Sequence, residues 1–599
     1  MKNDEKNPVN QEPLKEPNPE PSKESDSSSF NIPHSSLPDT MRKKRTLMLS
    51  VPQRLEGLAV VVLAIAALVF LGMSARTLYQ FPVPDSYRWY GDETWLMLAW
   101  KNLIAHGRMV VPIALESTLQ QSPGLLLGSS WFTALWYGVP QLLFPPHFDP
   151  VTIGRTVSFC FGLAMLFIIG RAGYRLKLSA SITTLSIVLL VATPAFTLAS
   201  HSARYDMITG VAVLGFIEFF AVRIGDRFLD RPRRGTRFAA WLGFAALLIC
   251  LTISPHVGAL VLLPTLFLAW YFGAFRTIGN AISFVAGAAV AFAALSAIYI
   301  LANHHLALAG IAAGDNQERA YLQHVPILRL FSWSAERHQL GAKLYYLWHE
   351  APAFTIVLPF IALSEIILLF RKRQHAATLF LTICLGCVLL SGALLQSTLP
   401  YYVSYFLPLA ALVFAAHARE WANGVWLRPA IAIVSLVMAV EIFAFWLPEL
   451  SHAGKMGKRI DDANTAAVQA AIEQASLKWE PGTDHPLILA QAPAIHELLR
   501  DTNVRVMSEA FLFFPLHPFP LHRPNALPIQ SPDSVIARAD VNYILDYNKP
   551  MTPEYELAVH KWKPIFSRAG PLLDRTLNYF HDTASELDTM TMYQVDSLQ

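Results

Sequence analysis

Long apolar runs occupy the middle of the chain and predict membrane-spanning helices. The first covers residues 58–73, and ten more, of about 17–25 residues each, follow between positions 151 and 447. The later runs lie near 151–170, 180–199, 207–222, 238–253, 256–274, 278–302, 352–370, 376–396, 400–416 and 429–447. Because about 20 apolar residues in a helix cross a bilayer core, the pattern predicts an α-helical polytopic membrane protein with about eleven transmembrane helices.

One further apolar segment, residues 124–144, decides the orientation of everything after it. If it lies along the outer surface, the basic loops that begin at Arg171 and Arg371 fall in the cytoplasm; if it spans the membrane, they face out. The positive-inside rule favours the first arrangement. We therefore interpret it as a juxtamembrane amphipathic segment whose aromatic residues suit the membrane interface: Trp131, Trp136 and Tyr137.

The two ends of the chain are polar. Residues 1–50 are rich in Pro, Glu, Lys and Ser, a composition that cannot bury enough apolar surface to offset the entropy of ordering. This predicts a disordered cytoplasmic tail. A multi-span transmembrane domain at 51–451 and an extracytoplasmic domain at 452–599 are expected to follow.

The C-terminal domain alternates helix-like and strand-like stretches, which predicts a small soluble α/β domain. We expect strands at 486–490, 504–507, 541–545 and 590–595, and helices at 461–477, 494–500 and 554–562. The domain has no G-x-G-x-x-G, P-loop or G-x-S-x-G motif. Acceptor docking or structural support is therefore its expected role.

Composition agrees with a membrane protein and argues against several other classes. Only 15% of the residues are charged, against roughly 25% in soluble domains. The net charge is +3 without a long Lys/Arg block, so nucleic acid is not an expected partner. The cysteines all lie in apolar stretches, where we expect core packing rather than a disulfide framework: Cys160, Cys250, Cys384 and Cys387.

Three regions share the outer face in this orientation: a loop at 78–150, a second at 303–350, and the C-terminal domain. Chemistry there has no access to cytoplasmic ATP or nucleotide sugars, which favours a sugar donor already carried across on a lipid. The long tail ahead of the first span and the cysteine-free outer domain favour the inner (plasma) membrane of a bacterium, with the C-terminal domain in the periplasm or outside. A eukaryotic endoplasmic reticulum membrane is the alternative.

An acidic pair stands in the first outer loop. Asp92 or Glu93 can begin a helix with one apolar face, and Gly107 can end it. The pair would then lie at a helix N-terminus on the outer membrane surface. The alternative is that Asp92 only caps this helix.

A second charged group, at residues 201–206, lies at the outer end of the third span. Arg204 and Asp206 are expensive to leave in lipid, so we expect them to face a cavity or the aqueous boundary. The alternative is a snorkelling Arg204 paired with its neighbour. Arg155, at the outer mouth of the second span, would alone be an ordinary interfacial anchor.

The acidic pair, Gly107 and Val111-Pro112 together resemble the first external loop of the GT-C superfamily of membrane glycosyltransferases. The likeness is greatest to the lipid A aminoarabinose transferases and protein O-mannosyltransferases of glycosyltransferase families 39 and 83. In those families the Asp of the pair is the proposed catalytic base, which implies this role for Asp92. They also place an acidic residue where Asp206 stands and a basic one where Arg155 stands. The resemblance covers residues 55–450 and is strongest in 90–210.

Two departures from the family pattern matter. Where the aminoarabinose transferases carry Glu-Lys-Pro and their relatives His-Pro-Pro, this chain has Gln121-Ser122-Pro123, which leaves metal dependence and acceptor class open. The family's Tyr-Leu-Leu-Pro helix is recognisable at 405–408, but without the basic residue often found just ahead of it. Donor phosphate binding must then come from other basic residues: Arg155, Arg204, Arg319, Arg337 and Lys343.

The resemblance implies an enzyme that moves a hexosyl or pentosyl group from a polyprenyl-phosphate donor to an acceptor hydroxyl on a lipid, glycan or protein, with inversion. Asp92 would act as base and Arg204 would stabilise the leaving phosphate. Glu93 and Asp206 would orient the acceptor or Asp92, or hold a divalent cation such as magnesium. The sequence leaves the cofactor open.

Two other classes of function stay open. A non-catalytic envelope assembly protein on the same scaffold is favoured by the departure at Gln121. A lipid-linked sugar transporter or flippase would need ionisable residues at mid-membrane depth, whereas the notable acids here lie at the outer ends of spans.

Overall fold

A computed structural model of the chain defines the fold. It describes residues 51–78, 86–87, 90–91, 131–144, 150–224, 235–253, 255–302, 333–371, 375–394, 400–421, 427–477, 487–490, 505–508, 543–547, 561–570 and 588–594.

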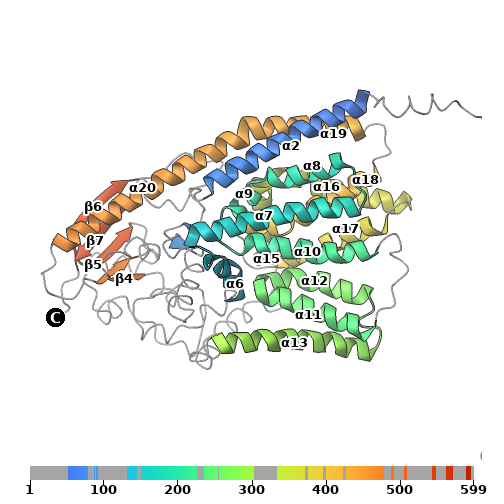
Figure 1. The fold of residues 1–599 in the computed structure, drawn as a ribbon, viewed down its shortest axis with the longest axis horizontal. Coiled ribbons are helices and arrows are strands. Elements are labelled where there is room, and N and C mark those ends of the chain that lie inside the picture. The colour runs from blue at the N-terminus through green and yellow to red at the C-terminus, as the bar shows by residue number, and fades with distance from the viewer. Residues whose placement is uncertain are drawn as a thin grey trace, which may run out of the picture. The chain divides into compact units, whose positions relative to one another are not determined.

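Helices, most of them apolar, make up most of the described residues (Figure 1). Those from the first half of the chain are α2 (Val51–Thr77), α6 (Trp131–Gln141), α7 (Pro150–Arg175), α8 (Ala180–Val191), α9 (Pro194–Ser200), α10 (Asp206–Ile224), α11 (Thr236–Ile253), α12 (Pro255–Tyr271) and α13 (Ile278–Ala302). Those that follow are α15 (Trp333–Glu350), α16 (Pro352–Arg371), α17 (Ala376–Leu394), the 3₁₀ turn η2 (Pro400–Tyr405), α18 (Leu407–Glu420), α19 (Leu427–Glu441), the π-helical turn η3 (Ile442–Trp446) and α20 (Leu447–Leu477).

Each of the eleven apolar runs coincides with helical structure. Within the described ranges, five helices are long and apolar enough to cross a membrane: Gln53–Thr77, Val151–Arg175, Ile278–Ala297, Pro352–Arg371 and Arg428–Lys458. A sixth span arises if the bent pair α8 and α9 counts as one. The chain is therefore a multi-pass membrane protein, and the total of eleven spans stays a prediction.

The bend of 70° between α8 and α9 has a local cause. Thr193 caps α9 by accepting a hydrogen bond from the Phe196 amide at 3.2 Å, and Pro194 stands at the start of α9. A proline in the first helical turn cannot donate to the preceding helix, so α8 ends and a new helix begins.

Helix α18 lies in the centre of the bundle. It packs against α7, α8, α10, α16 and α17, and its residues from Leu407 to Leu412 are all buried. Ser186 of α8 donates a hydrogen bond to the Ala411 carbonyl of α18 at 2.6 Å. The segment that follows η2 is therefore held on every side by other helices.

Helix α6 covers part of the 124–144 segment. Its 11 residues span about 16 Å, at about 1.5 Å per residue. Residues 124–130 lie outside the described residues, so the orientation of the whole segment stays a prediction. Trp136 is exposed, as a membrane interface would require. The expectation for Tyr137 was wrong: this residue is fully buried against α7, where its ring meets Phe161 edge-on.

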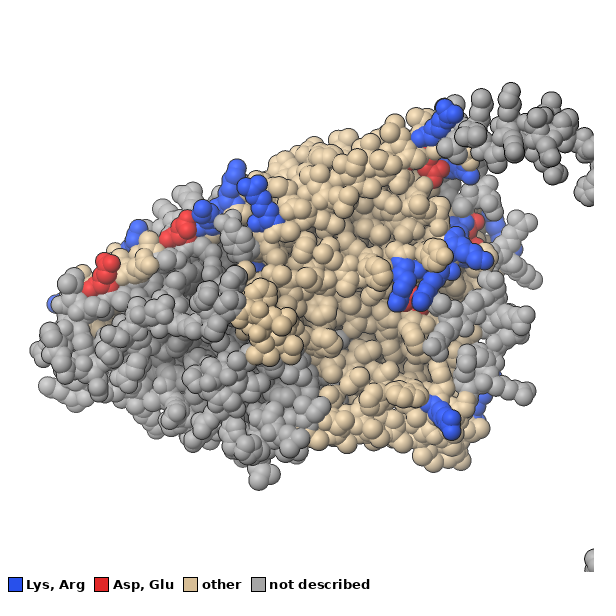
Figure 2. All heavy atoms as spheres, viewed as in Figure 1, with Lys and Arg blue, Asp and Glu red and all other residues tan. Residues whose placement is uncertain are grey.

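Figure 2 shows one group of basic side chains at the end of the bundle where α7 ends at Arg175 and α16 ends at Arg371, and a second group farther along the molecule, toward α20. We call the end that holds the first group the basic end. Glu218 of α10 is buried there and accepts from both Arg171 and Arg175, the latter at 3.4 Å. The start of α7, with Arg155, therefore lies at the opposite end.

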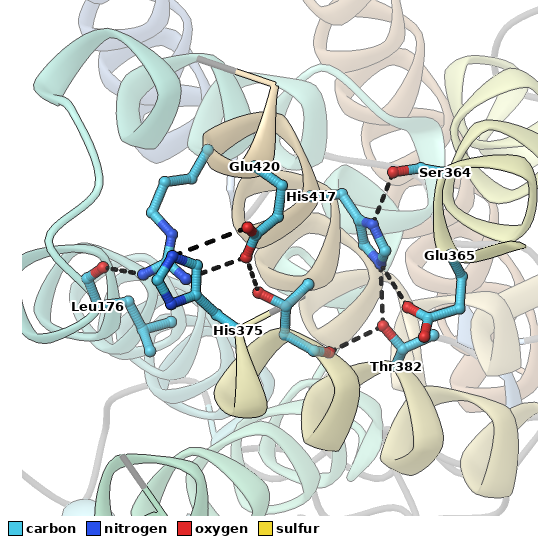
Figure 3. Close-up of polar contacts among 9 residues, drawn as sticks. Leu176, Ser364, Glu365, His375, Thr382, His417 and Glu420 are labelled. Carbon is cyan, nitrogen blue, oxygen red and sulfur yellow. Dashed lines mark hydrogen bonds and ion pairs between the residues drawn. The ribbon is translucent and has the colours of Figure 1, made fainter. Parts of the chain in front are cut away.

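A buried polar network joins α16, α17 and α18 at the basic end (Figure 3). His417 has no exposed surface, and its Nδ1 lies 2.8 Å from Ser364 Oγ and its Nε2 lies 2.9 Å from Thr382 Oγ1. Trp421 donates to Ser364, and the Thr382 hydroxyl donates to the Thr378 carbonyl. The imidazole therefore accepts from Ser364 and donates from Nε2 to Thr382.

Glu420 continues this network toward α7. It accepts hydrogen bonds from Thr378 at 2.8 Å and from Arg419 at 3.1 Å. Arg419 also donates to the Leu176 carbonyl just after α7, at 2.6 Å. Hydrogen-bonded side chains thus tie four helices together where apolar packing alone would leave their rotation weakly fixed.

The substitution His417→Leu tests this network. It removes the shared partner of the buried Ser364 hydroxyl and the half-buried Thr382 hydroxyl, which should cost about 1–3 kcal/mol of stability. Thermal unfolding of the detergent-solubilised protein should show a lowered midpoint. His452→Leu, at an exposed position of α20, is the matched control, and equal midpoints for the two variants would contradict a stabilising role.

Helices α11 and α13 approach each other at two glycines. A Cβ atom at Gly287 would overlap the Ala240 carbonyl, and one at Gly243 would overlap the Phe284 carbonyl. Small residues let membrane helices pack backbone against backbone, where apolar burial provides no driving force. The pairing of these two helices therefore depends on both positions.

We accordingly expect Gly287→Ala to push α13 away from α11. Since the added methyl meets backbone atoms that cannot rotate aside, the cost should be of the order of 1–3 kcal/mol. Gly386→Ala is the control, because no atom lies within 4 Å of a Cβ built there. Thermal unfolding midpoints compare the two variants, and an unchanged midpoint for Gly287→Ala would show that the helices do not meet here.

Five strands near the C-terminus form one mixed sheet of order β4-β3-β5-β7-β6. They are β3 (Leu487–Ala490), β4 (Arg505–Ser508), β5 (Tyr543–Tyr547), β6 (Lys563–Gly570) and β7 (Asp588–Gln594). Strand β3 pairs in parallel with β4 and β5, and β7 pairs antiparallel with β5 and β6.

The four strands expected from the sequence overlap β3, β4, β5 and β7. Strand β6 was missed because its sequence, KPIFSRAG, contains a proline and lacks clean alternation; the register shifts between Pro564 and Phe566. The expected helix at 461–477 is the second part of α20, whereas 494–500 and most of 554–562 lie outside the described residues. The α/β layering of this domain stays a prediction.

Candidate functional site

The structure describes only some of the residues expected to form the site. Asp92, Glu93 and Arg319 lie outside the described residues, and Arg337 lies in α15 with a side chain that is likewise not described. Four expected residues remain to be placed: Arg155, Arg204, Asp206 and Lys343.

Arg204 and Asp206 form a buried ion pair at the opposite end from the basic residues. Arg204 Nε donates to Asp206 Oδ2 at 2.9 Å, and the exposed fractions of the two residues are 1% and 0%. Asp206 is the first residue of α10, where the helix dipole favours a carboxylate. Neither side chain snorkels to the surface, so the pair is part of the interior of the protein.

Tyr405 completes this pair from another part of the chain. Its hydroxyl donates to Asp206 Oδ1 at 2.6 Å, so each carboxylate oxygen has a donor. A buried ion pair is tolerated only when such additional hydrogen bonds satisfy its charged atoms. We call Arg204, Asp206 and Tyr405 the charged cluster.

A glycine allows the two segments of the charged cluster to meet. At Gly210 of α10, a Cβ atom would lie 3.1 Å from the Ser404 carbonyl and closer still to the Met165 methyl. Helix α10 and turn η2 therefore lie in direct contact, with Tyr405 at the end of η2. Turn η2 ends one residue before α18, which begins with Leu407 and Pro408. Because a proline in the first turn favours the start of a helix, α18 begins here and Tyr405 stays at the end of η2.

Tyr137 connects α6 to the charged cluster. Its hydroxyl lies 3.0 Å from Ser158 Oγ of α7 and donates to the Arg204 carbonyl. The backbone of Arg204 is thus held by a residue that precedes α7, while its guanidinium is held by α10. This explains the burial of Tyr137 that the amphipathic pattern did not predict.

Arg155 and His201 lie nearby and are also buried. Arg155 Nη1 donates to the Leu78 carbonyl after α2, at 3.3 Å. His201 Nε2 lies 3.0 Å from the Ser74 carbonyl oxygen, and Nδ1 lies 2.7 Å from the Thr197 carbonyl oxygen. Burial lowers the pKa of His201 to about 4, and the charge of Arg155 acts in the same direction.

This low pKa gives folding a pH dependence. Between pH 6.5 and 4 the unfolded chain binds a proton at His201 and the folded chain does not, so stability falls as the pH falls through this window. The contribution should reach at most about 3 kcal/mol. His201→Gln should flatten the decline of the unfolding midpoint between pH 6.5 and 4. The exposed His452→Gln should leave the slope as in the wild type, and equal slopes for all three proteins would contradict the assignment.

Helix α15 brings Lys343 to the same end of the bundle. It packs against α9, η2 and α16, and Lys343 is half-buried on it. Its exposed residues include Leu344, Tyr345 and Trp348, a set suited to a membrane interface. At the end of α15, burial raises the pKa of Glu350 to about 7.

The structure brings together two segments that the sequence marked separately. Asp206 and the tyrosine of the 405–408 motif are in contact although 199 residues separate them. Sequence reasoning missed Tyr137 and Ser158 as neighbours of the cluster. Their only signal was a polar or aromatic side chain beside an apolar run, which many other positions share.

The described residues include no group of three His, Cys, Asp or Glu side chains placed to hold a metal ion. Asp206, one of the two residues expected to bind a divalent cation, shares its carboxylate with Arg204, whose charge opposes a second cation. Its partner in that expectation, Glu93, lies outside the described residues. Magnesium binding stays a prediction.

The spans define the class of the protein as a multi-pass helical membrane protein. Three solved structures align with it, each at 13% sequence identity. ArnT from Cupriavidus metallidurans bound to undecaprenyl phosphate matches with a TM-score of 0.49, and its apo state with 0.45; both comparisons cover 89% of this chain and 98% of ArnT. A third match, with a TM-score of 0.42, is archaeal oligosaccharyltransferase AglB from Archaeoglobus fulgidus in complex with an inhibitory peptide and a dolichol-phosphate. This comparison covers 85% of this chain and 73% of AglB.

No family model and no curated protein matches the chain by sequence. At 13% identity and TM-scores below 0.5, the structural likenesses do not assign a reaction to it.

Proposed function

We propose that the chain is a membrane glycosyltransferase that moves a hexosyl or pentosyl group from a polyprenyl-phosphate donor to an acceptor hydroxyl at the outer face of the membrane. The observation that carries this proposal is the charged cluster. A guanidinium and a carboxylate are buried at one end of an apolar bundle, and ionisable residues in that setting are costly enough to indicate a functional site.

The positive-inside rule supports the expected sidedness. Arg171, Arg175 and Arg371 lie at the basic end, which the rule assigns to the cytoplasm. The charged cluster then lies toward the outer face, on the same side as the loop that holds Asp92. A donor at this face must be carried by lipid, because nucleotide sugars stay in the cytoplasm.

In the proposed reaction, Asp92 takes the proton from the acceptor hydroxyl as its oxygen attacks the anomeric carbon. The bond between that carbon and the phosphate oxygen breaks, the configuration inverts, and the polyprenyl phosphate leaves with the additional negative charge. Arg204 and Arg155 stabilise this charge in a site shielded from water. Lys343, Arg319 and Arg337 are further candidates for phosphate binding.

The hydrogen bonds of Asp206 favour a role that the sequence did not predict. Both of its oxygens accept from residues of the cluster, so it is better suited to orient Arg204 than to orient the acceptor or Asp92 or to hold a divalent cation. Glu93 is left to orient the acceptor or Asp92, or to contribute to a divalent cation site.

Replacing the proposed base tests the reaction. Wild type and Asp92→Asn are reconstituted in liposomes with labelled polyprenyl-phosphate sugars and envelope extract as acceptor. Loss of the general base should lower transfer by about 10²- to 10⁴-fold. Asp462→Asn, at an exposed position of α20, should transfer at the wild-type rate, and the label identifies the acceptor as lipid, glycan or protein.

Three results would contradict the proposal. Equal transfer by wild type and Asp92→Asn would remove Asp92 from the mechanism. Absence of transfer by every protein, with labelled lipid crossing to the opposite leaflet, would instead indicate a flippase. An assembly scaffold would show neither activity. In cells, the wild type and Asp92→Asn would then support envelope assembly equally well.

A further inference from the structure

The face of α19 that carries Glu441 has the features of a docking site inside the membrane. We propose that it binds a membrane-spanning helix of a partner protein, and that this helix carries a lysine or arginine at mid-membrane depth. The site uses no residue of the charged cluster and takes no part in the proposed reaction.

Glu441 lies about halfway across the membrane. It belongs to the longest of the described candidate spans, Arg428–Lys458. Near the start of this span, Ile431 packs against the last turn of α18, at the basic end. Near its other end, Gly454 meets the last residue of α2. Glu441 is midway between Arg428 and Gly454, roughly 20 Å from each at about 1.5 Å per residue, so its carboxylate is close to the centre of the hydrocarbon core.

The carboxylate stands at the border of a lipid-facing surface. Val437 and Phe445, which lie about one turn before and after Glu441, have exposed fractions of 59% and 65%. Met438 and Ile442, on the neighbouring face, are buried in the bundle. Glu441 itself is half-buried. Its side chain is therefore within reach of a further helix that packs against a face which no described helix covers.

The π-helical turn η3 gives the carboxylate a hydrogen-bond donor from its own helix. Residues five apart point in different directions in an α-helix, whereas the wider π-helical turn brings them to one side. Trp446 Nε1 thus donates to Glu441 Oε1 at 3.3 Å. Among the described residues, no basic side chain pairs with Glu441, whereas Glu218 and Asp206 each have an arginine.

The charge of this site selects one kind of partner. A carboxylate in hydrocarbon is costly, and one long hydrogen bond from a neutral donor offsets only part of that cost. A lysine or arginine at the middle of another span is equally costly by itself, so pairing removes both costs together. A second copy of this chain would instead bring two Glu441 carboxylates together, and like charges oppose each other.

Model helices of known sequence test the proposal. The full chain in liposomes is titrated with a labelled helix of about 20 leucine and alanine residues that has one lysine at its centre, and binding is measured by energy transfer. This helix should bind roughly tenfold more tightly than the same helix without lysine. A helix with its lysine at one end carries the same charge at the wrong depth, and it should bind as weakly as the helix without lysine.

Variants of Glu441 locate the effect. Glu441→Gln and Glu441→Leu should each abolish the preference for the central lysine. Glu449→Gln, in the first turn of α20, is the matched control and should keep the preference. The unfolding midpoint of Glu441→Leu should not fall below that of the wild type, because the change removes a costly charge from the membrane. A lowered midpoint would make Glu441 a structural residue tied to Trp446 and would overturn the proposal.

The remaining outcomes also decide the proposal. Equal binding of the three model helices to the wild type would overturn it, as would an undiminished preference in Glu441→Gln. Energy transfer between two differently labelled copies of the chain, lost in Glu441→Leu, would show that this face joins copies of the protein and would overturn the choice of partner. None of these measurements uses sugar transfer, so they test the docking site independently of the proposed function.

Discussion

A charged pair buried in an apolar bundle is the constraint on which the site depends. Removing Arg204 and Asp206 from water costs several kcal/mol per ion, and their mutual attraction offsets this only with good geometry and further hydrogen bonds. The structure supplies these from separate segments: the Tyr405 hydroxyl for the carboxylate and Tyr137 for the Arg204 backbone. Such a cluster forms only when α6, α7, α10 and η2 are all in place, so the charges and the helix packing specify each other.

The local features of the sequence predicted much of the fold. Apolar length predicted the helices because a spanning segment must satisfy its backbone internally, whatever its neighbours are. Thr193 and Pro194 show why finer features were harder to predict: they bend one apolar run by 70°, although the run at 180–199 is continuous in hydrophobicity. In the C-terminal sheet, β6 was missed because its place depends on pairing with β7 and not on its own pattern.

The site could be predicted only in part. Arg204 and Asp206 were recognisable because charged residues beside apolar runs are rare. Their contact with Tyr405 was not, since no local rule links positions so far apart along a chain. Tyr137 shows the opposite case, in which an aromatic residue typical of the interface is buried because its hydroxyl has partners in the interior. The likeness to the GT-C superfamily indicated which segments to compare, and the structure showed that two of them meet.

Helix α18 connects the two polar regions of the bundle. Tyr405 stands just before its first residue, and His417 and Glu420 lie in its last turn. Its 14 residues span about 21 Å at 1.5 Å per residue, and side-chain hydrogen bonds fix each end. Apolar packing alone leaves the rotation of a helix among its neighbours weakly fixed, and hydrogen bonds at both ends fix the rotation and the axial position of α18 together. A substitution that rotates α18 at His417 should therefore also displace Tyr405 at the other end of the helix.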